Sequence, residues 1–92
     1  MDKGDMKQEV LDFLRDDYNG QRDAGIPYYG TWMKSLVRFV AIHPRLGRTV
    51  GKRLMFAAVR ELKDEGLVKQ VDGGGFTGTL LLTHSGVAEV AK

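Results

Sequence analysis

The sequence predicts a small α+β fold in which three helices precede a two-stranded hairpin and a short closing helix. Two patterns support this class. Apolar residues recur at spacings of three and four in successive segments up to Asp64, as on amphipathic helices. Beyond them, the glycine-rich segment 73–78 separates two short segments of strand-forming residues. The chain has 92 residues, of which 42% are hydrophobic, so residues 1–92 are expected to form a single domain around one core.

The first helix is expected over residues 5–18. Its apolar positions follow helical spacing: Met6, Val10, Phe13, Leu14 and Tyr18. Asn19-Gly20 is expected to end the helix, because both residues tolerate the left-handed conformation of a helix C-cap. The connector 21–30 is expected to be extended at 26–29, because the residue before a proline is disfavoured in a helix, and a small strand near Ile26 is left open.

The second helix is expected over Trp32 to Ile42, with Thr31 as its N-cap. Its apolar face is formed by Trp32, Leu36, Phe39 and Val40, and Lys34 and Arg38 lie on its solvated side. Pro44 cannot continue a helix, so residues 43–47 are expected to be a turn. Core packing around the first helix is favoured for the aromatic residues Tyr18, Tyr28, Tyr29 and Trp32, over a ligand pocket or a dimer contact.

The third helix is expected from Arg48 or Thr49 to Asp64, with one apolar and one basic side. The apolar side is assigned to Val50, Leu54, Ala58 and Leu62, flanked by Ala57 and Val59. The other side carries Lys52, Arg53, Phe56, Arg60 and Lys63. An exposed Phe56 would suit a dimer contact, a thymine methyl group or packing under the hairpin, and the sequence leaves these alternatives open.

The hairpin is expected to consist of strands over 67–72 and 79–83. The intervening Gly73-Gly74-Gly75-Phe76-Thr77-Gly78 matches the letters of a dinucleotide-binding fingerprint. That fingerprint must open a helix within a βαβ unit, whereas a strand is expected to follow here. The segment is therefore interpreted as a hairpin tip. A short helix over 85–91 is expected to close the chain.

Charge is distributed unevenly along the chain, although its formal net value is only +2. Residues 1–23 hold four basic and seven acidic side chains, and residues 64–92 hold two and four. Residues 24–63 hold eight basic side chains, and Glu61 is the one acidic residue among them. Any solvated helix carries some Lys and Arg, but this clustering favours a polyanionic partner for the middle of the chain.

Other classes of function find little support in the sequence. The absence of cysteine excludes disulfides and thiolate metal sites, and no apolar segment suggests a signal peptide or a membrane span. His43 and His84 lack carboxylates at metal-ligand spacing, and no set of residues resembles a catalytic site. We therefore expect a cytoplasmic protein that is not an enzyme, with no cofactor, no metal and no membrane partner.

Three segments resemble the winged helix-turn-helix superfamily, in particular small regulators of the MarR and PadR kind. One is the helix-turn-helix from Thr31 to Asp64. The second is the junction 61–68, which is similar to the "L-x-x-x-G-L-I/V" that follows the recognition helix. The third is 82–86, which is similar to "L-T-x-x-G" after the second wing strand. The resemblance covers about two-thirds of the chain and implies a winged helix with the hairpin as its wing.

The resemblance implies sequence-specific binding of double-stranded DNA by a transcriptional regulator, usually a homodimer, with the third helix in the major groove. With the basic residues nearby, it predicts these DNA-binding residues: Lys34, Arg38, Arg45, Arg48, Thr49, Lys52, Arg53, Phe56 and Arg60. The expected wing tip is Gly74, Gly75, Phe76 and Thr77, which carries no cation. The alternative is a winged helix that binds an acidic protein partner through its basic face.

Overall fold

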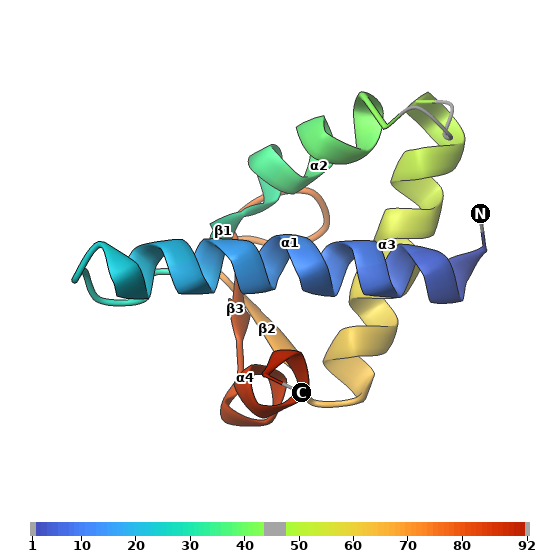
Figure 1. The fold of residues 1–92 in the computed structure, drawn as a ribbon. Coiled ribbons are helices and arrows are strands. Elements are labelled where there is room, and N and C mark those ends of the chain that lie inside the picture. Colours follow the sequence, from blue (N-terminus) through green and yellow to red (C-terminus); the bar gives the residue numbers. More distant parts are fainter. Residues whose placement is uncertain (1, 44–47, 92) are drawn as a thin grey trace.

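The computed structural model describes residues 2–43 and 48–91, which form four helices and a small three-stranded antiparallel sheet. The expected α+β class is confirmed. The elements in chain order are α1 (Lys3–Asp23), β1 (Thr31–Trp32), α2 (Met33–Ala41), α3 (Arg48–Asp64), β2 (Val68–Val71), β3 (Thr79–Leu82) and α4 (His84–Val90) (Figure 1).

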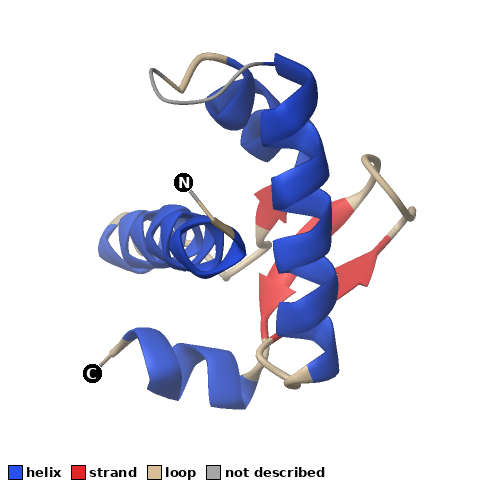
Figure 2. Ribbon diagram, turned by 90° about the vertical axis from the view of Figure 1, so that its right-hand side faces the viewer, coloured by secondary structure: helices blue, strands red, loops and turns tan. Residues whose placement is uncertain are grey.

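In Figure 2, α3 runs in front of the sheet, with α1 seen end-on at one side of it and the hairpin tip at the other, and α2 and α4 lie toward its two ends. The core is formed where α1, α2 and α3 meet the sheet. Its fully buried side chains include Met6, Leu14, Met33, Leu36, Met55, Leu62 and Leu80. One long side of α3 faces the viewer in Figure 2 with no other element in front of it.

The strands are arranged in the order β1-β3-β2, so β3 is central. Thr31 pairs with Leu80 and Trp32 with Thr79, while β2 pairs with β3 from Val68–Leu82 to Val71–Thr79. Before β1 begins, the hydroxyl of Tyr28 accepts a hydrogen bond of 3.0 Å from the Leu82 N–H. This bond satisfies a strand donor that β1 is too short to reach.

Helix α1 continues through Asn19-Gly20 to Asp23, so the predicted end of the first helix is wrong. The reason is a tertiary contact. The buried Gln21 side chain donates to the Gly30 carbonyl at 2.9 Å and accepts from the Tyr29 N–H at 2.9 Å. These two bonds hold the connector against α1 and require Gln21 to remain on the helix, which overrides the local preference of Asn19-Gly20.

The first strand lies at Thr31–Trp32 rather than near the exposed Ile26, and Thr31 is not the N-cap of α2. The Thr31 hydroxyl instead donates to Asp17 on α1 at 2.7 Å. Trp32 occupies the cap position, with no side-chain cap bond. Because successive strand residues point to opposite faces, Thr31 is buried and Trp32 is 63% exposed. The expected core position of Trp32 is therefore wrong.

Helix α3 has the predicted bounds, but its buried face is rotated from the predicted one. Met55, Ala58, Val59 and Leu62 are buried, whereas Val50 and Ala57 are exposed. The predicted stripe advanced in steps of four residues, and each step overshoots a 3.6-residue turn by about 40°. Three steps therefore place Val50 about 120° around the helix from Leu62.

The hairpin and the closing helix agree with the prediction to within one or two residues. A strand, β3, follows the glycine-rich tip, which confirms that the tip is part of a hairpin. Helix α4 begins at His84, and the Thr83 hydroxyl caps it by accepting from the Gly86 N–H. Of the predicted turn 43–47, residues 44–47 lie outside the described residues. No helix in the described part of the chain has the length and apolar character needed to cross a membrane.

Candidate nucleic-acid interface

The uncovered side of α3 carries a stripe of exposed residues, which we call the exposed stripe: Val50, Arg53, Phe56, Ala57 and Arg60. These positions follow helical spacing and therefore share one face. Neither Arg53 nor Arg60 forms an ion pair within the described residues. Lys52 lies beside the stripe and is half-buried. The stripe thus presents two guanidinium groups to solvent.

The acidic residues Glu61 and Glu65, near the end of α3, are held by lysines of α1. Lys7 Nζ lies 3.0 Å from Glu61 Oε1 and 2.5 Å from Glu65 Oε1, and Lys3 Nζ lies 2.7 Å from Glu61 Oε2. Hydrogen bonds from Lys3 and Lys7 lower the pKa of Glu61, and bonds to Glu65 and Glu61 raise the pKa of Lys7. These carboxylates are neutralised on the α1 side of α3, so the exposed stripe keeps its positive charge.

The hairpin tip is fastened to α3. The rings of Phe56 and Phe76 have centroids 5.4 Å apart and planes tilted by 58°. Of the three alternatives for Phe56, the structure shows packing against the hairpin, and 39% of its side chain stays exposed. Such an aromatic pair adds about 0.5–1.5 kcal/mol beyond the area it buries.

Gln70 of β2 provides a second attachment between the tip and α3. Its amide nitrogen donates to the carbonyls of Gly75 at 3.1 Å and Thr77 at 2.6 Å, and its oxygen accepts from Lys63 of α3. Within the tip, the Thr77 hydroxyl donates to the Gly74 carbonyl at 2.8 Å. Lys63 is therefore engaged with the hairpin, and the tip has a defined position beside the exposed stripe.

Three adjoining depressions extend along this side of the molecule. The helix depression, of about 310 Å³, is lined by Arg53, Phe56, Ala57, Arg60 and Phe76. The tip depression, of about 390 Å³, is lined by Trp32, Lys34, Phe76, Thr77, Gly78 and Thr79. The α2 depression, of about 430 Å³, is lined by Phe13, Trp32, Lys34, Ser35, Arg38, Phe39 and Ile42. Phe76 is shared by the first two depressions, and Trp32 and Lys34 are shared by the last two. Four cations and no carboxylate are among these lining residues.

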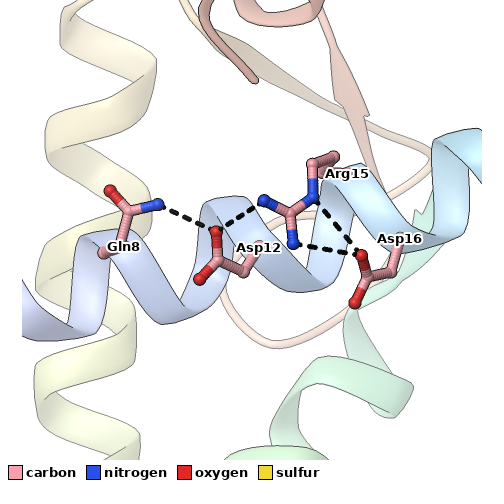
Figure 3. Close-up of polar contacts among 4 residues, drawn as sticks. All are labelled: Gln8, Asp12, Arg15 and Asp16. Atoms are coloured by element: carbon pink, nitrogen blue, oxygen red, sulfur yellow. Dashed lines mark hydrogen bonds and ion pairs between the residues drawn. The ribbon is translucent and has the colours of Figure 1, made fainter. Parts of the chain in front are cut away.

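A different surface, on α1, is acidic and internally paired. Gln8 donates to Asp12 at 2.8 Å, and Arg15 bonds both Asp12 and Asp16 at 3.2 Å (Figure 3). Two further depressions are lined by Asp12, Asp16 and Asp17 among other residues. The depressions beside α3 and the tip are thus lined by cations and those on α1 by carboxylates, although Asp64 at the end of α3 and Asp72 before the tip are also exposed.

The predicted site residues fall into three groups: those gathered around Phe76 and Thr77, those exposed elsewhere on α2 and the tip, and the remainder. The structure brings Arg53, Phe56 and Arg60 together with Phe76 of the tip, and it places Lys34 beside Phe76 and Thr77. Arg38 is exposed on α2, and Gly74 and Gly75 are exposed at the tip. Lys52 is half-buried, Arg48 and Thr49 are the first two residues of α3, and Arg45 lies outside the described residues.

Sequence reasoning missed the exposure of Trp32 on this side of the molecule. The helical pattern included Trp32 because Leu36 follows four residues later. The polar Ser35, three residues after Trp32, was a weak signal against this interpretation, since a core-facing helix usually has apolar residues at both spacings. The pairing of Trp32 with Thr79, distant in sequence, determines its orientation.

Among the described residues, no group of three or more His, Cys, Asp or Glu side chains is placed to hold a metal ion. Comparison of the chain with protein-family models, with curated proteins and with solved structures returned no match.

Proposed function

We propose that this protein is a winged helix-turn-helix regulator of transcription that binds double-stranded DNA sequence-specifically, with α3 in the major groove. The observation that carries the proposal is the exposed stripe of α3, which presents Arg53 and Arg60 without ion-pair partners among the described residues, beside a fastened hairpin tip. The element order, with a short strand before α2 and a hairpin after α3, is the order expected of that fold.

The dimensions of the exposed stripe fit DNA. The major groove is about 12 Å wide and admits an α-helix. Arg53 and Arg60 are seven residues apart, which corresponds to about 10 Å along the helix axis. That distance equals the rise of about three base pairs. Arginine can pair bidentately with guanine, so two arginines at this spacing would read bases near the two ends of a short site.

The other cations suit contacts with the DNA backbone. Lys34 and Arg38 are exposed on α2, where Lys34 lines the tip depression and both line the α2 depression. Contacts of this kind fix the register of a protein on DNA, while base contacts provide the sequence specificity. In this arrangement α3 reads sequence, and α2 holds the phosphates.

The test is titration of duplex DNA at several salt concentrations. Each neutralised phosphate adds about −0.9 to the slope of log affinity against log salt. Lys34 and Arg38, engaged with two phosphates, predict a slope of about −2. Millimolar binding that does not change with salt would contradict the proposal.

A second candidate function is binding of an acidic protein partner by the same basic face. Two observations favour it. The tip carries no cation, and the apolar side chains of Ile42 and Val50 are exposed at the facing ends of α2 and α3. Capture of one protein partner that survives nuclease treatment would support this candidate over DNA binding.

Light scattering with and without DNA would establish whether the protein is the expected homodimer, because a dimer sets the half-site spacing.

A further inference from the structure

The tip depression combines two exposed aromatic side chains with a cation. Trp32 is 63% exposed and Phe76 is 43% exposed, and both line the depression together with Lys34. Its volume of about 390 Å³ falls in the range of about 300–1,000 Å³ that is usual for small-molecule sites. Rings left in water forgo the stabilisation of burial, so their exposure at one place indicates a binding surface.

The backbone that carries Trp32 and the ring of Phe76 are each held by neighbouring structure. Trp32 belongs to β1 and pairs with Thr79, and the Met33 N–H donates to the Gly78 carbonyl at 3.0 Å. Phe76 is held by its contact with Phe56 and by the bonds from Gln70 to the tip backbone. The backbone at Trp32 and the ring of Phe76 therefore need little ordering when a ligand enters, which favours affinity.

The surroundings of the depression select a ligand with negative charge. Lys34 lines it, Arg53 and Arg60 line the helix depression on one side, and Arg38 lines the α2 depression on the other. No carboxylate is among the residues that line the three depressions. Aromatic rings interleaved with cations along a groove are the usual means of binding single-stranded nucleic acid, in which bases stack on rings and phosphates meet Lys or Arg.

We propose that the tip depression binds an unpaired nucleotide of DNA, by stacking of its base on Trp32 and Phe76 and pairing of its phosphate with Lys34. Paired bases inside a duplex have no free face for such stacking, so the nucleotide must come from an unpaired extension or an opened end. The inference rests on the proposed function, because α3 would hold the adjoining duplex. The preferred ligand is thus a duplex that continues into a single strand.

Intrinsic fluorescence provides a direct test, because Trp32 is the single tryptophan of the chain. The intact protein is titrated with a blunt duplex and with the same duplex carrying a four-nucleotide thymidine extension on either the 5′ or the 3′ end. Stacking predicts quenching of Trp32 by the extended duplex that the blunt duplex does not produce. The extension should also tighten binding by about tenfold, within the range expected for one stacked base. Thymidine monophosphate at the same concentration should quench far less, since α3 does not hold it in place.

Substitutions assign the effect to the depression. Trp32→Ala should remove the gain from the extension, measured by anisotropy of labelled DNA, while Trp32→Phe should keep part of it. Tyr29→Ala is the matched control, because Tyr29 is a similarly exposed aromatic side chain whose own depression is lined by Asp16 and Asp17. It should leave the gain unchanged. Circular dichroism of each variant checks that the fold is intact.

The outcomes separate this proposal from the proposed function. If the blunt duplex binds but the extension adds neither affinity nor quenching, the stacking site is wrong and duplex binding stands. Equal quenching by free thymidine monophosphate overturns the preference for an extended duplex. If no duplex binds but a thymidine oligonucleotide quenches Trp32, with affinity lost in Trp32→Ala, the stacking site is supported and the proposed function fails.

Discussion

At the scale of single residues, Arg53 can be tested by substitution, with Arg22 as the matched control. Arg53 lies on the exposed stripe of α3, whereas Arg22 is exposed in the last turn of α1, 3.5 Å from Asp23. Figure 1 shows that end of α1 on the opposite side of the molecule from α3. Both are guanidinium groups in water. If α3 reads bases, Arg53→Ala should weaken binding to the preferred sequence by about 1–3 kcal/mol, and Arg22→Ala should not.

The measurement is a competition between the preferred duplex and a scrambled duplex at one fixed salt concentration. An equal loss on both duplexes would mean that Arg53 contacts phosphate and does not read a base. No loss on either duplex would remove it from the interface.

Substitution of glycine by alanine is expected to have opposite effects on stability at two helical positions. A methyl group at Gly20 of α1 would enter open space, whereas one at Gly86 of α4 would overlap the carbonyl oxygen of Leu67. Gly20→Ala should therefore stabilise the protein by about 0.5–1 kcal/mol, through its gain in helix propensity. Gly86→Ala should destabilise it, because α4 must move away from the turn that precedes β2.

Urea denaturation of the two glycine variants beside the native chain measures both effects. A stabilising effect of Gly86→Ala would show that α4 does not pack against Leu67 in solution.

At the scale of elements, the attachment of α1 to α3 should depend on pH. The lowered pKa of Glu61 means that its contribution is present above the ordinary value of 4.5 and is lost as pH falls through the lower, folded-state pKa. The raised pKa of Lys7 means that its contribution is complete below 10.5 and is lost as pH rises through the higher, folded-state pKa. Between these limits the ion pairs stabilise the helix packing.

Lys7→Met should therefore lower the urea midpoint near pH 7, and the difference from the native chain should shrink as the pH falls below 4.5. The effect should be small, since exposed ion pairs are weak. A difference that stays constant down to pH 2 would assign the effect of Lys7 to packing instead.

The hairpin tip is a separate element whose position depends on Gln70. Gln70→Leu removes the two bonds to the tip carbonyls and the contact with Lys63, while the sheet pairing of residue 70 with Leu80 remains. Amide hydrogen exchange at residues 75–78 should become faster, and exchange in the middle of α1 should not change. Uniform acceleration throughout the chain would show that Gln70 supports the whole fold.

The elements also show why sequence reasoning succeeded in some places and failed in others. Helix α3 was predicted from the helical spacing of its apolar residues, and the hairpin from the glycines of its tip, both of which are local signals. The end of α1 and the place of β1 depend on Gln21 and Thr31, whose partners lie elsewhere in the chain. No local pattern reports such contacts. In the candidate site, Arg53, Phe56 and Arg60 were found from spacing, but Trp32 was not, because its exposure depends on pairing with β3.

At the scale of the whole molecule, a net charge of +2 conceals two faces of opposite character. Free cations gather around α3, α2 and the tip, and paired carboxylates cover part of α1. Such a distribution orients a protein before it touches a polyanion and accelerates productive encounters at low salt. It also disfavours approach of DNA to α1.

The strand order β1-β3-β2 has a consequence for how the chain folds. Strand β1 precedes α2 in the chain but pairs with β3, which follows α3 and β2. The chain between the two paired strands therefore contains both helices. The hairpin and each helix can form locally, but Thr31 can reach Leu80 only after a long segment has closed on itself, with its loss of entropy. The docking of β1 is thus expected to follow formation of the hairpin, and the surface that displays Trp32 is expected to be among the last to be completed.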